Sequence, residues 1–256
     1  MADFSQSYDE LAAHYGQIFE DWEASIARQA TVLAGILDRE CGDRRHVRVL
    51  DCACGIGTQS LGLAMKGFDV TGCDISIEAV QRARSEASKR GLSIGFSVAN
   101  MVQMTAIPKS SFDAVICIDN SLPHLQSEEE LLQAAQQAYG KLRPGGSFIC
   151  SIRDYDRLVV ERPTTEGPSF YSDNDSSRIV FQIWDWLDER RYRFHLYITR
   201  NTESAWQTLH FTSTYRAVLR CELQRILEEA GFINIRWLSP SDSGFYQPIF
   251  VAHRNC

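Results

Sequence analysis

Hydrophobic residues recur along the chain in two patterns, one typical of buried strands and one typical of amphipathic helices. Short apolar runs rich in β-branched residues predict strands at residues 47–50, 68–73, 93–98, 112–118 and 147–152. Between these runs, apolar side chains recur every three or four positions and predict helices, the clearest at residues 76–90 and 127–142. Strands and helices that alternate in this way favour an α/β fold with a parallel sheet.

The pattern changes on either side of this region. Residues 7–40 have helical spacing and predict two helices that pack on the sheet. Residues 157–177 are rich in proline, glycine and polar residues and predict a loop near the mouth of a site. Strict alternation then predicts antiparallel strands at residues 179–183, 192–198 and 206–211. The last elements predicted are a helix at 218–230 and strands at 232–238 and 246–253.

A glycine-containing turn joins the first predicted strand to the helix that follows it. The turn reads Ala53-Cys54-Gly55-Ile56-Gly57, and its glycines let the backbone approach a ligand without intervening Cβ atoms. The first amide groups of the helix point into the same gap. Asp74 ends the second strand, where a carboxylate can accept hydrogen bonds from both hydroxyl groups of a ribose. The unit therefore predicts a site for a ligand that contains a nucleoside.

Two ligands of this kind are candidates, a dinucleotide and S-adenosylmethionine. A dinucleotide fingerprint has a third glycine, where this chain has Ser60. Asp51 disfavours a nearby pyrophosphate but suits a cationic sulfonium and an α-amino group. The motif Asp51-x-Ala53-Cys54-Gly55-x-Gly57, followed by Asp74, resembles the cofactor motif of class I S-adenosylmethionine-dependent methyltransferases. The Arg143-Pro144-Gly145-Gly146 segment before a strand resembles a second signature of that family.

The resemblance implies a fold and a domain organisation. The implied fold is α/β, with a doubly wound, mostly parallel seven-stranded Rossmann-like sheet and an antiparallel β insert on the substrate side. Residues 1–156 and 217–256 are expected to form the S-adenosylmethionine-binding core, in which N-terminal helices cover the cofactor. Residues 157–216 are expected to form the insert. The insert is rich in aromatic residues, and there the resemblance is weakest.

The resemblance also assigns residues to the cofactor. Asn100 and Met101 follow the third strand and are expected to recognise adenine, through a polar side chain near the exocyclic amine and an apolar side chain on the ring. Many family members have an acid where this chain has Asn100. The expected cofactor contacts are Tyr15, Asp51, Ala53, Gly55, Gly57, Asp74, Ile75, Asn100, Met101 and Ile118.

Two further segments concern the methyl acceptor. Residues 120–125 read Asn-Ser-Leu-Pro-His-Leu and resemble a stretch of glycine N-methyltransferases, and the Asn/Asp-Pro-Pro-Tyr/Phe motif of enzymes that methylate nucleobase or glutamine nitrogens is absent. Residues 153–156 read Arg-Asp-Tyr-Asp and resemble a second stretch, in which the matching arginine binds the carboxylate of the amino acid. Asn120 and Arg153 are therefore the expected catalytic residues, which orient the acceptor.

Other side chains are expected to contact the acceptor as well. The expected substrate-binding residues are Asn120, His124, Arg153, Trp184 and Tyr215. The alternatives are a structural role for His124, a core role for the aromatic residues of the insert, and a salt bridge between Arg153 and the neighbouring Asp154 or Asp156.

Composition restricts the class of partner. The chain has 33 acidic and 26 basic residues and a net charge of −7, which disfavours nucleic acid as a partner. Eight cysteines without a regular framework are typical of a reduced, cytoplasmic protein, and Cys52-Ala53-Cys54 lacks the spacing of a zinc site, so no metal is expected. No signal peptide or bilayer-length apolar run is found, so no membrane partner is expected. A homo-oligomer is left open.

The sequence thus predicts an S-adenosylmethionine-dependent methyltransferase that acts on a small molecule and releases S-adenosylhomocysteine. The resemblance suggests that the acceptor is the nitrogen of glycine, sarcosine or a related amine. An O-methyltransferase, or an N-methyltransferase of a larger secondary metabolite, is the main alternative because it would use the same cofactor residues. An NAD-dependent oxidoreductase and a non-catalytic S-adenosylmethionine-binding protein are more distant alternatives.

Overall fold

The computed structural model describes residues 8–42, 47–172, 177–202 and 205–256, which form two separate β-sheets. The larger sheet has seven strands in the order β10-β11-β5-β4-β1-β2-β3, and β11 alone runs antiparallel to its neighbours. Its strands are β1 (Arg48–Asp51), β2 (Asp69–Asp74), β3 (Gly95–Val98), β4 (Phe112–Cys117), β5 (Leu142–Ser151), β10 (Phe232–Leu238) and β11 (Ile249–Arg254). The predicted doubly wound, mostly parallel α/β fold is confirmed.

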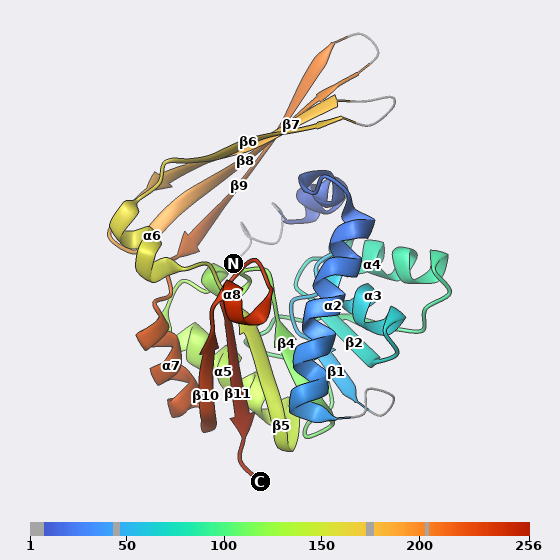
Figure 1. The fold of residues 1–256 in the computed structure, drawn as a ribbon, viewed down its shortest axis with the longest axis vertical. Coiled ribbons are helices and arrows are strands. Elements are labelled where there is room, and N and C mark those ends of the chain that lie inside the picture. The colour runs from blue at the N-terminus through green and yellow to red at the C-terminus, as the bar shows by residue number, and fades with distance from the viewer. Residues whose placement is uncertain (1–7, 43–46, 173–176, 203–204) are drawn as a thin grey trace.

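Helices cover both faces of this sheet, as Figure 1 shows. On one face lie α2 (Trp22–Cys41), α3 (Thr58–Met65) and α4 (Ile77–Lys89), and on the other α5 (Glu128–Lys141) and α7 (Arg220–Glu229). Shorter helical segments are η1 (Tyr15–Ile18), η3 (Leu122–His124), α6 (Tyr155–Glu161) and α8 (Pro240–Ser243). Within the described residues, no helix combines the length and the apolar composition needed to cross a bilayer.

The central strands are buried on both faces and lead to one ligand-binding edge. Leu50, Val115 and Ile116 have no exposed surface, as expected for parallel strands covered by two layers of helices. From β1 the chain proceeds outward to β2 and β3, whereas from β4 it proceeds the other way to β5. Open α/β sheets bind ligands at the carboxyl ends of the strands where the order reverses in this way. The fold therefore places a site at the ends of β1 and β4.

The segment Pro144-Gly145-Gly146 lies inside β5, whereas the sequence predicted a strand that starts after it. Leu142 already pairs with Phe112, and a register shift follows before Ser147 pairs with Ala114. Gly145 has φ +73°, a conformation that glycine adopts without a steric penalty. The three residues therefore form an irregular part of the strand.

The smaller sheet has four antiparallel strands, one more than predicted. They are β6 (Thr165–Ser172), β7 (Ser177–Trp186), β8 (Arg191–Asn201) and β9 (Trp206–Arg216). The prediction of a loop over residues 157–177 is wrong for the described part, which contains most of α6 and all of β6; residues 173–176 lie outside the described residues. A register shift between Glu166 and Ser169, at Gly167-Pro168, interrupts the alternation of β6 and hides the strand from the sequence pattern.

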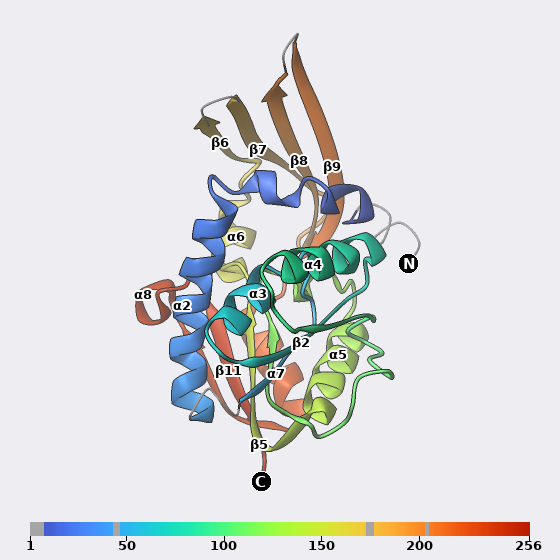
Figure 2. The ribbon, with the colours of Figure 1, turned by 90° about the vertical axis from the view of Figure 1, so that its right-hand side faces the viewer.

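The N-terminal segment lies between the two sheets, as Figure 2 shows in blue. Residues 8–12 are helical, and α2 starts after Asp21, whose side chain accepts a hydrogen bond from the Ala24 amide. Leu11 packs in a cluster with residues of the smaller sheet. Ala12 packs instead against Ile56 of the glycine turn and Ala79 of α4. The predicted helical region is thus interrupted between residues 12 and 22, and its residue 7 lies outside the described residues.

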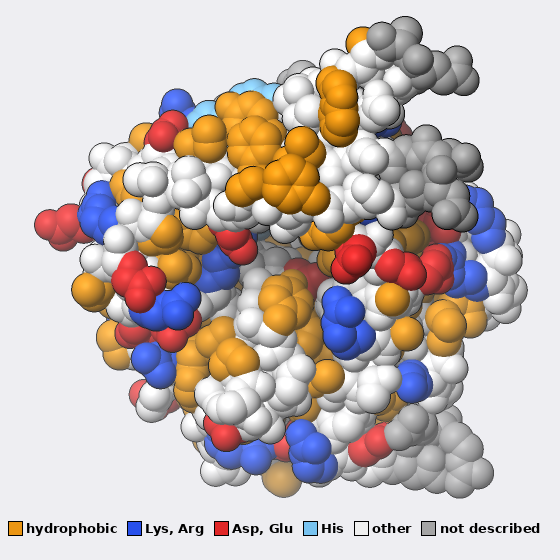
Figure 3. Space-filling model, turned by 45° about the horizontal axis from the view of Figure 1, so that its top comes forward, with side chains coloured by type: hydrophobic (Ala, Val, Ile, Leu, Met, Phe, Trp, Pro, Cys, Tyr) orange, Lys and Arg blue, Asp and Glu red, His pale blue; other side chains and the backbone are white. Residues whose placement is uncertain are grey.

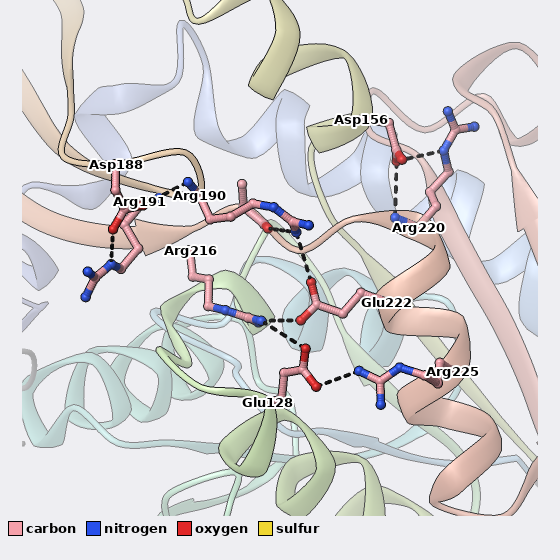
Figure 4. A network of polar contacts seen from close by, with 10 residues as sticks. Glu128, Asp156, Asp188, Arg190, Arg191, Arg216, Arg220, Glu222 and Arg225 are labelled. Atoms are coloured by element: carbon pink, nitrogen blue, oxygen red, sulfur yellow. Dashed lines mark hydrogen bonds and ion pairs between the residues drawn. The ribbon is translucent and has the colours of Figure 1, made fainter.

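Ion pairs fasten the smaller sheet to the helices beneath it, as Figure 4 shows. Arg216, the last residue of β9, pairs with Glu222 of α7, and Arg190 lies 3.3 Å from the same carboxylate. Arg220 of α7 binds Asp156 of α6 at 2.9 Å. Glu222 is buried, so its two guanidinium partners stabilise it more than an exposed pair would.

Two helical glycines provide a test of how closely α3 packs on α2. A Cβ atom at Gly62 would lie 2.6 Å from Ala30 Cβ and 2.9 Å from the Ile26 carbonyl oxygen, whereas one at Gly140 would meet nothing within 4 Å. We expect Gly62→Ala to lower the free energy of unfolding by about 1–3 kcal/mol through overpacking. Gly140→Ala should raise it by about 0.5–1 kcal/mol. Urea unfolding measures both free energies. Equal effects of the two substitutions would contradict the close packing of α3 on α2 at Gly62.

Candidate active site

A cavity of about 1280 Å³ lies between the carboxyl ends of the larger sheet and the smaller sheet. The side of the smaller sheet that lines it, here called the inner face, includes Gln182, Trp184, Phe194 and Tyr215. All the predicted cofactor and substrate residues line this cavity except Asp51 and Gly57. The fold therefore brings together residues that are far apart in the sequence.

The glycine turn and the end of β2 form one end of the cavity. The Gly55 amide donates a hydrogen bond to one carboxylate oxygen of Asp74 at 2.8 Å, and the Ser76 amide donates to the other at 3.0 Å. Burial raises the pKa of Asp74, while these amide hydrogen bonds oppose the rise. Gly55 has φ +51°, and no atom lies within 4 Å of the place of a Cβ. The backbone here is therefore open to a ligand.

Two loops complete this end of the cavity. Asn100 follows β3, and its side-chain oxygen accepts a hydrogen bond from the Val102 amide at 3.1 Å, which fixes the amide group of the side chain. Met101 lies beside it on the cavity wall, and Tyr15 of η1 lines the opposite, N-terminal side. The other predicted cofactor residues on the wall are Ala53, Ile75 and Ile118.

Asp51 and Gly57 do not line the cavity, and their predicted contact with the cofactor stays a prediction. The Asp51 side chain is buried and accepts a hydrogen bond from Ser60 Oγ at 2.7 Å. Burial raises the pKa of Asp51 to about 7. A Cβ at Gly57 would lie 3.3 Å from Ala83 and Leu61, at φ +96°, so this glycine serves the packing of the turn. Asp51 can act on a ligand only through its charge.

Several lining residues at the α2 end of the cavity were not predicted. Gln59 donates hydrogen bonds to Gln29 at 2.7 Å and to Asp119 at 2.6 Å, and the Tyr246 hydroxyl donates to Asp119 at 2.5 Å. Arg28 lines this end and brings a guanidinium that suits a ligand carboxylate. Only the helical spacing of α2 marks Arg28 in the sequence, and that spacing does not distinguish it from other exposed residues.

Asn120 lies at the end of β4 in a strained backbone. Asp119 and Asn120 have φ values of +60° and +64°, which are unfavourable for residues with a Cβ. The Asn120 side-chain oxygen accepts a hydrogen bond from the Arg153 amide at 3.0 Å. Its side-chain nitrogen is buried without a hydrogen-bond partner in the described residues, and the residue lines the cavity. A buried donor without a partner is costly, so a ligand acceptor is expected there.

Arg153 lies against the inner face of the smaller sheet. Its guanidinium donates a hydrogen bond to the Tyr192 hydroxyl at 3.0 Å and lies 4.5 Å from the centre of the Trp184 ring. The predicted alternative of a salt bridge is not found in the described residues, because Asp154 and Asp156 both lie near Arg220 instead. No described carboxylate lies within ion-pair distance of this guanidinium, and the charge of Glu166 on the same wall acts on it from farther away, so the guanidinium can still bind a ligand carboxylate.

His124 and three tyrosines form the rest of this region. Tyr8 Oη lies 2.5 Å from His124 Nε2 and 3.4 Å from Tyr215 Oη. Burial, together with the charge of Arg153, lowers the pKa of His124 to about 3, so the imidazole is neutral at neutral pH. Burial raises the pKa values of Tyr8, Tyr192 and Tyr215, so their hydroxyl groups stay protonated. Tyr8 was not predicted as a site residue; its seven-residue spacing from Tyr15 would put both on one face of a continuous helix, but the helix is interrupted after residue 12.

These features define the class of protein. A doubly wound sheet with a glycine turn after β1, a buried carboxylate at the end of β2 and polar residues after β3 and β4 is a class I S-adenosylmethionine-dependent methyltransferase. S-adenosylmethionine fits the residues present: Asp74 faces the cavity beside the open Gly55 backbone, and Arg28 lines the α2 end. The described residues contain no group of three or more His, Cys, Asp or Glu side chains arranged to hold a metal ion.

Comparison with known proteins narrows the class to a family. A family model described as a methyltransferase domain matches residues 49–146. A glycine/sarcosine N-methyltransferase from Parasynechococcus marenigrum (strain WH8102) is 33% identical over 253 residues, which cover 98% of this chain and 82% of that protein. One from Aphanothece halophytica is 27% identical over 98% of this chain and 86% of its own length. The chain belongs to the S-adenosylmethionine-dependent methyltransferase family that includes these enzymes.

Solved structures agree in fold. The S-adenosylmethionine-bound structure of CalS10, an amino pentose methyltransferase from Micromonospora echinaspora, has a TM-score of 0.75 at 18% sequence identity and covers 95% of each chain. A methyltransferase from Clostridium acetobutylicum has a TM-score of 0.74 at 14% identity. Both likenesses extend over the smaller sheet as well as the larger one, because they cover nearly the whole chain. The predicted family and its cofactor are confirmed.

The role of Asp74 can be tested against a second aspartate of the same strand. Asp69 starts β2 with its side chain 69% exposed, far from the cavity wall. We expect Asp74→Ala to weaken S-adenosylhomocysteine binding by roughly ten- to a hundredfold, the loss of one or two hydrogen bonds to a charged group. Asp69→Ala should leave binding unchanged. Isothermal titration calorimetry measures both, and melting temperatures without ligand separate a binding effect from unfolding.

The charge of Asp51 should make the preference for the cationic cofactor depend on pH. Above its pKa of about 7 Asp51 is charged and favours the sulfonium of S-adenosylmethionine over neutral S-adenosylhomocysteine. Below that pH it takes up a proton, and we expect the affinity ratio of the two ligands to fall about fivefold, or ~1 kcal/mol. Asp51→Asn should show a flat ratio. A ratio that does not change with pH in the unaltered protein would show that Asp51 does not act on the sulfonium.

Proposed function

We propose that this methyltransferase transfers a methyl group to the nitrogen of a small amino acid whose carboxylate binds Arg153. The observation that carries the proposal is a permanent cation at the cavity wall without a carboxylate partner in the described residues. A carboxylate accepts two parallel hydrogen bonds from a guanidinium, which fixes both the position and the orientation of the acceptor. The glycine/sarcosine N-methyltransferases among the relatives support the same acceptor class.

Asn120 and the inner face are proposed to complete the acceptor site. The buried Asn120 nitrogen donates a hydrogen bond to the acceptor, and Trp184 and Tyr215 hold Arg153 in place through contacts with its guanidinium. Bound S-adenosylmethionine would supply an electrophilic methyl group, which the acceptor attacks in line with the carbon–sulfur bond, so that S-adenosylhomocysteine leaves as the neutral thioether. The residues of the chain contribute alignment and exclusion of water rather than a covalent intermediate.

The acceptor nitrogen must be unprotonated when it reacts, and the groups that surround Arg153 in the described residues, His124 and the tyrosines, do not hold its proton. His124 is neutral with a pKa of about 3, so it does not retain a proton at neutral pH. The phenols of Tyr8 and Tyr215 are already protonated, since burial raises their pKa values. We therefore propose that the amine enters as the free base and that its proton is lost to solvent.

A larger acceptor is the second candidate, because the cavity is roomy. Its volume of about 1280 Å³ includes the cofactor end, so the room for a larger acceptor is the part of the cavity beyond Arg153. Beyond Arg153 the wall continues along α6 and β6 with Arg157, Glu161 and Glu166. An acceptor that extends along this wall, with oxygen or nitrogen as the methylated atom, would use the same cofactor end.

In this proposal the smaller sheet forms the acceptor side of the active site. We assign residues 1–156 and 217–256 to the cofactor-binding core and residues 157–216 to the acceptor side, because the inner face supplies Trp184, Phe194 and Tyr215 to the cavity. A cytoplasmic location and the absence of a nucleic-acid partner stay predictions from composition.

The direct test is release of S-adenosylhomocysteine from purified protein and S-adenosylmethionine. Glycine, sarcosine and dimethylglycine should be compared with ethanolamine and a glycine ester, which keep the amine but lack the carboxylate. Turnover with the amino acids alone supports the proposal. Turnover only with larger amines, alcohols or acids would replace it with the second candidate.

Arginine substitutions test the carboxylate contact itself. We expect Arg153→Ala to lower kcat/KM for an amino-acid acceptor by roughly ten- to a hundredfold, equivalent to about 1.5–3 kcal/mol for a charged hydrogen bond. The affinity for S-adenosylhomocysteine should stay unchanged. Arg157→Ala is the matched control, because Arg157 lines the same cavity but pairs with Glu161 at 3.5 Å. An equal loss in both variants, or no loss in Arg153→Ala, would contradict the proposed contact.

A further inference from the structure

The smaller sheet has a second side, here called the outer face, which points away from the cavity. Its residues share one side of the sheet because registered partners on neighbouring strands face the same way. They are Phe170, Ile179, Phe181, Ile183, His195, Tyr197, Thr199, Thr208, His210 and Thr212. Figure 3 shows hydrophobic side chains and histidines gathered over this sheet.

Aromatic rings form a continuous stack across the outer face. The Phe181 ring lies 4.8 Å from the Tyr197 ring at an angle of 8°, and Tyr197 lies 4.5 Å from His210 at 13°. His195 extends the stack, 5.1 Å from His210, and its Nδ1 lies 2.9 Å from His210 Nε2. Such pairs stabilise the sheet, but the outer surface of the rings remains without a layer of its own chain.

The described part of the chain does not cover the outer face. The inner residues Val180, Leu196 and Ile198 belong to a buried cluster with Leu11, whereas Phe181, Tyr197 and Ile183 belong to none of the buried clusters. Phe170, on the same side, is 72% exposed. Figures 1 and 2 show no helix over this side of the sheet. An uncovered face of Phe, Ile and Tyr side chains, interspersed with uncharged Thr and His, is typical of an interaction surface.

The charge pattern restricts the partner. None of the ten outer-face residues named above is Asp, Glu, Lys or Arg, whereas 23% of the residues in the whole chain are charged. Asp185 and Arg193 lie at one end of the strands as cross-strand partners, and the Asp185 carboxylate lies 3.1 Å from Nε2 of His195. An uncharged face does not suit nucleic acid or a charged peptide, but it does suit an identical face turned by a two-fold rotation, since two-fold interfaces are self-complementary.

We propose that the outer face is a homodimer interface, in which the smaller sheets of two copies of this chain pack face to face. Strands about 4.8 Å apart and about 3.4 Å per residue give the four-stranded face a projected area of roughly 600 Å². The accessible area is larger, because side chains roughen the surface, and a stable interface needs about 800 Å² per partner. Two sheets that pack in this way bury the ring stacks between them in a layer about 10 Å thick.

The proposed dimer interface and the acceptor side of the cavity lie on opposite faces of the smaller sheet. The same strands carry the ring stack on one face and Trp184, Phe194 and Tyr215 on the other, with Arg153 held between those rings and the core. A partner sheet on the outer face holds these strands in position from behind. The interface therefore supports the acceptor side of the cavity without contributing a residue to it.

Sedimentation velocity tests the proposal. The chain has a mass of 29.0 kDa, and we expect the unaltered protein to sediment as a species of twice that mass over roughly 1–100 µM. Phe181→Glu and Tyr197→Glu should each give a monomer, because they would bury a carboxylate in an apolar interface. Val160→Glu is the matched control: Val160 is 81% exposed on α6, off the outer face, and this variant should remain a dimer.

A second pair of variants keeps the test decisive if the glutamates prevent folding. Thr199→Arg and Thr208→Arg add charge at cross-strand partners on the outer face and remove no ring. Both should be monomers that still bind S-adenosylhomocysteine, which reports on the cofactor end alone. A monomeric unaltered protein would overturn the proposal. A dimer that persists in all four outer-face variants would also overturn it, since its interface would then lie elsewhere.

Discussion

The position of one buried guanidinium governs the acceptor half of the molecule. Removing the charge of Arg153 from water is costly, and no described carboxylate forms an ion pair with it, although the charge of Glu166 acts on it from a longer distance. The chain instead surrounds it with the rings of Trp184, Phe194 and Tyr215 and with the hydroxyl of Tyr192. Those residues come from all three long strands of the smaller sheet, so the sheet has to lie against the carboxyl ends of β4 and β5. The aromatic rings stabilise the guanidinium charge in part, and a bound ligand carboxylate would supply the remaining negative charge.

The cofactor end could be predicted from the sequence because its determinants are local. The glycine turn, the helix after it and Asp74 follow one another within a single strand-helix-strand unit. The residues of each part strongly favour the local conformation that the structure shows. Asn100, Asn120 and Arg153 could be placed at one edge because each follows a parallel strand, and the carboxyl ends of such strands meet at the same edge. Asp51 shows the limit of this reasoning, since the same strand geometry that brings it to the edge turns its side chain into the core.

The acceptor end could be predicted only in part because its contacts join distant segments. Tyr8 meets His124 and Tyr215, and Tyr192 meets Arg153, across separations that no local pattern encodes. The strand β6 was missed for a different reason. Its register shift at Gly167-Pro168 removes the alternation by which a strand is recognised, although its pairing with β7 resumes on both sides. The acceptor site therefore depends on tertiary contacts that secondary-structure propensities do not reveal.

The position of β11 has a consequence for biosynthesis. This strand is the last element of the chain, yet it lies inside the larger sheet, between β10 and β5. A nascent chain can form the β1 to β4 region while synthesis continues, since those contacts involve residues already made. The edge of β5 stays unpaired until Ile249–Arg254 has been synthesised, and β10 joins the sheet only through β11, which pairs with both strands. A chain that still lacks this strand exposes the edge of β5, and an unpaired strand edge favours aggregation.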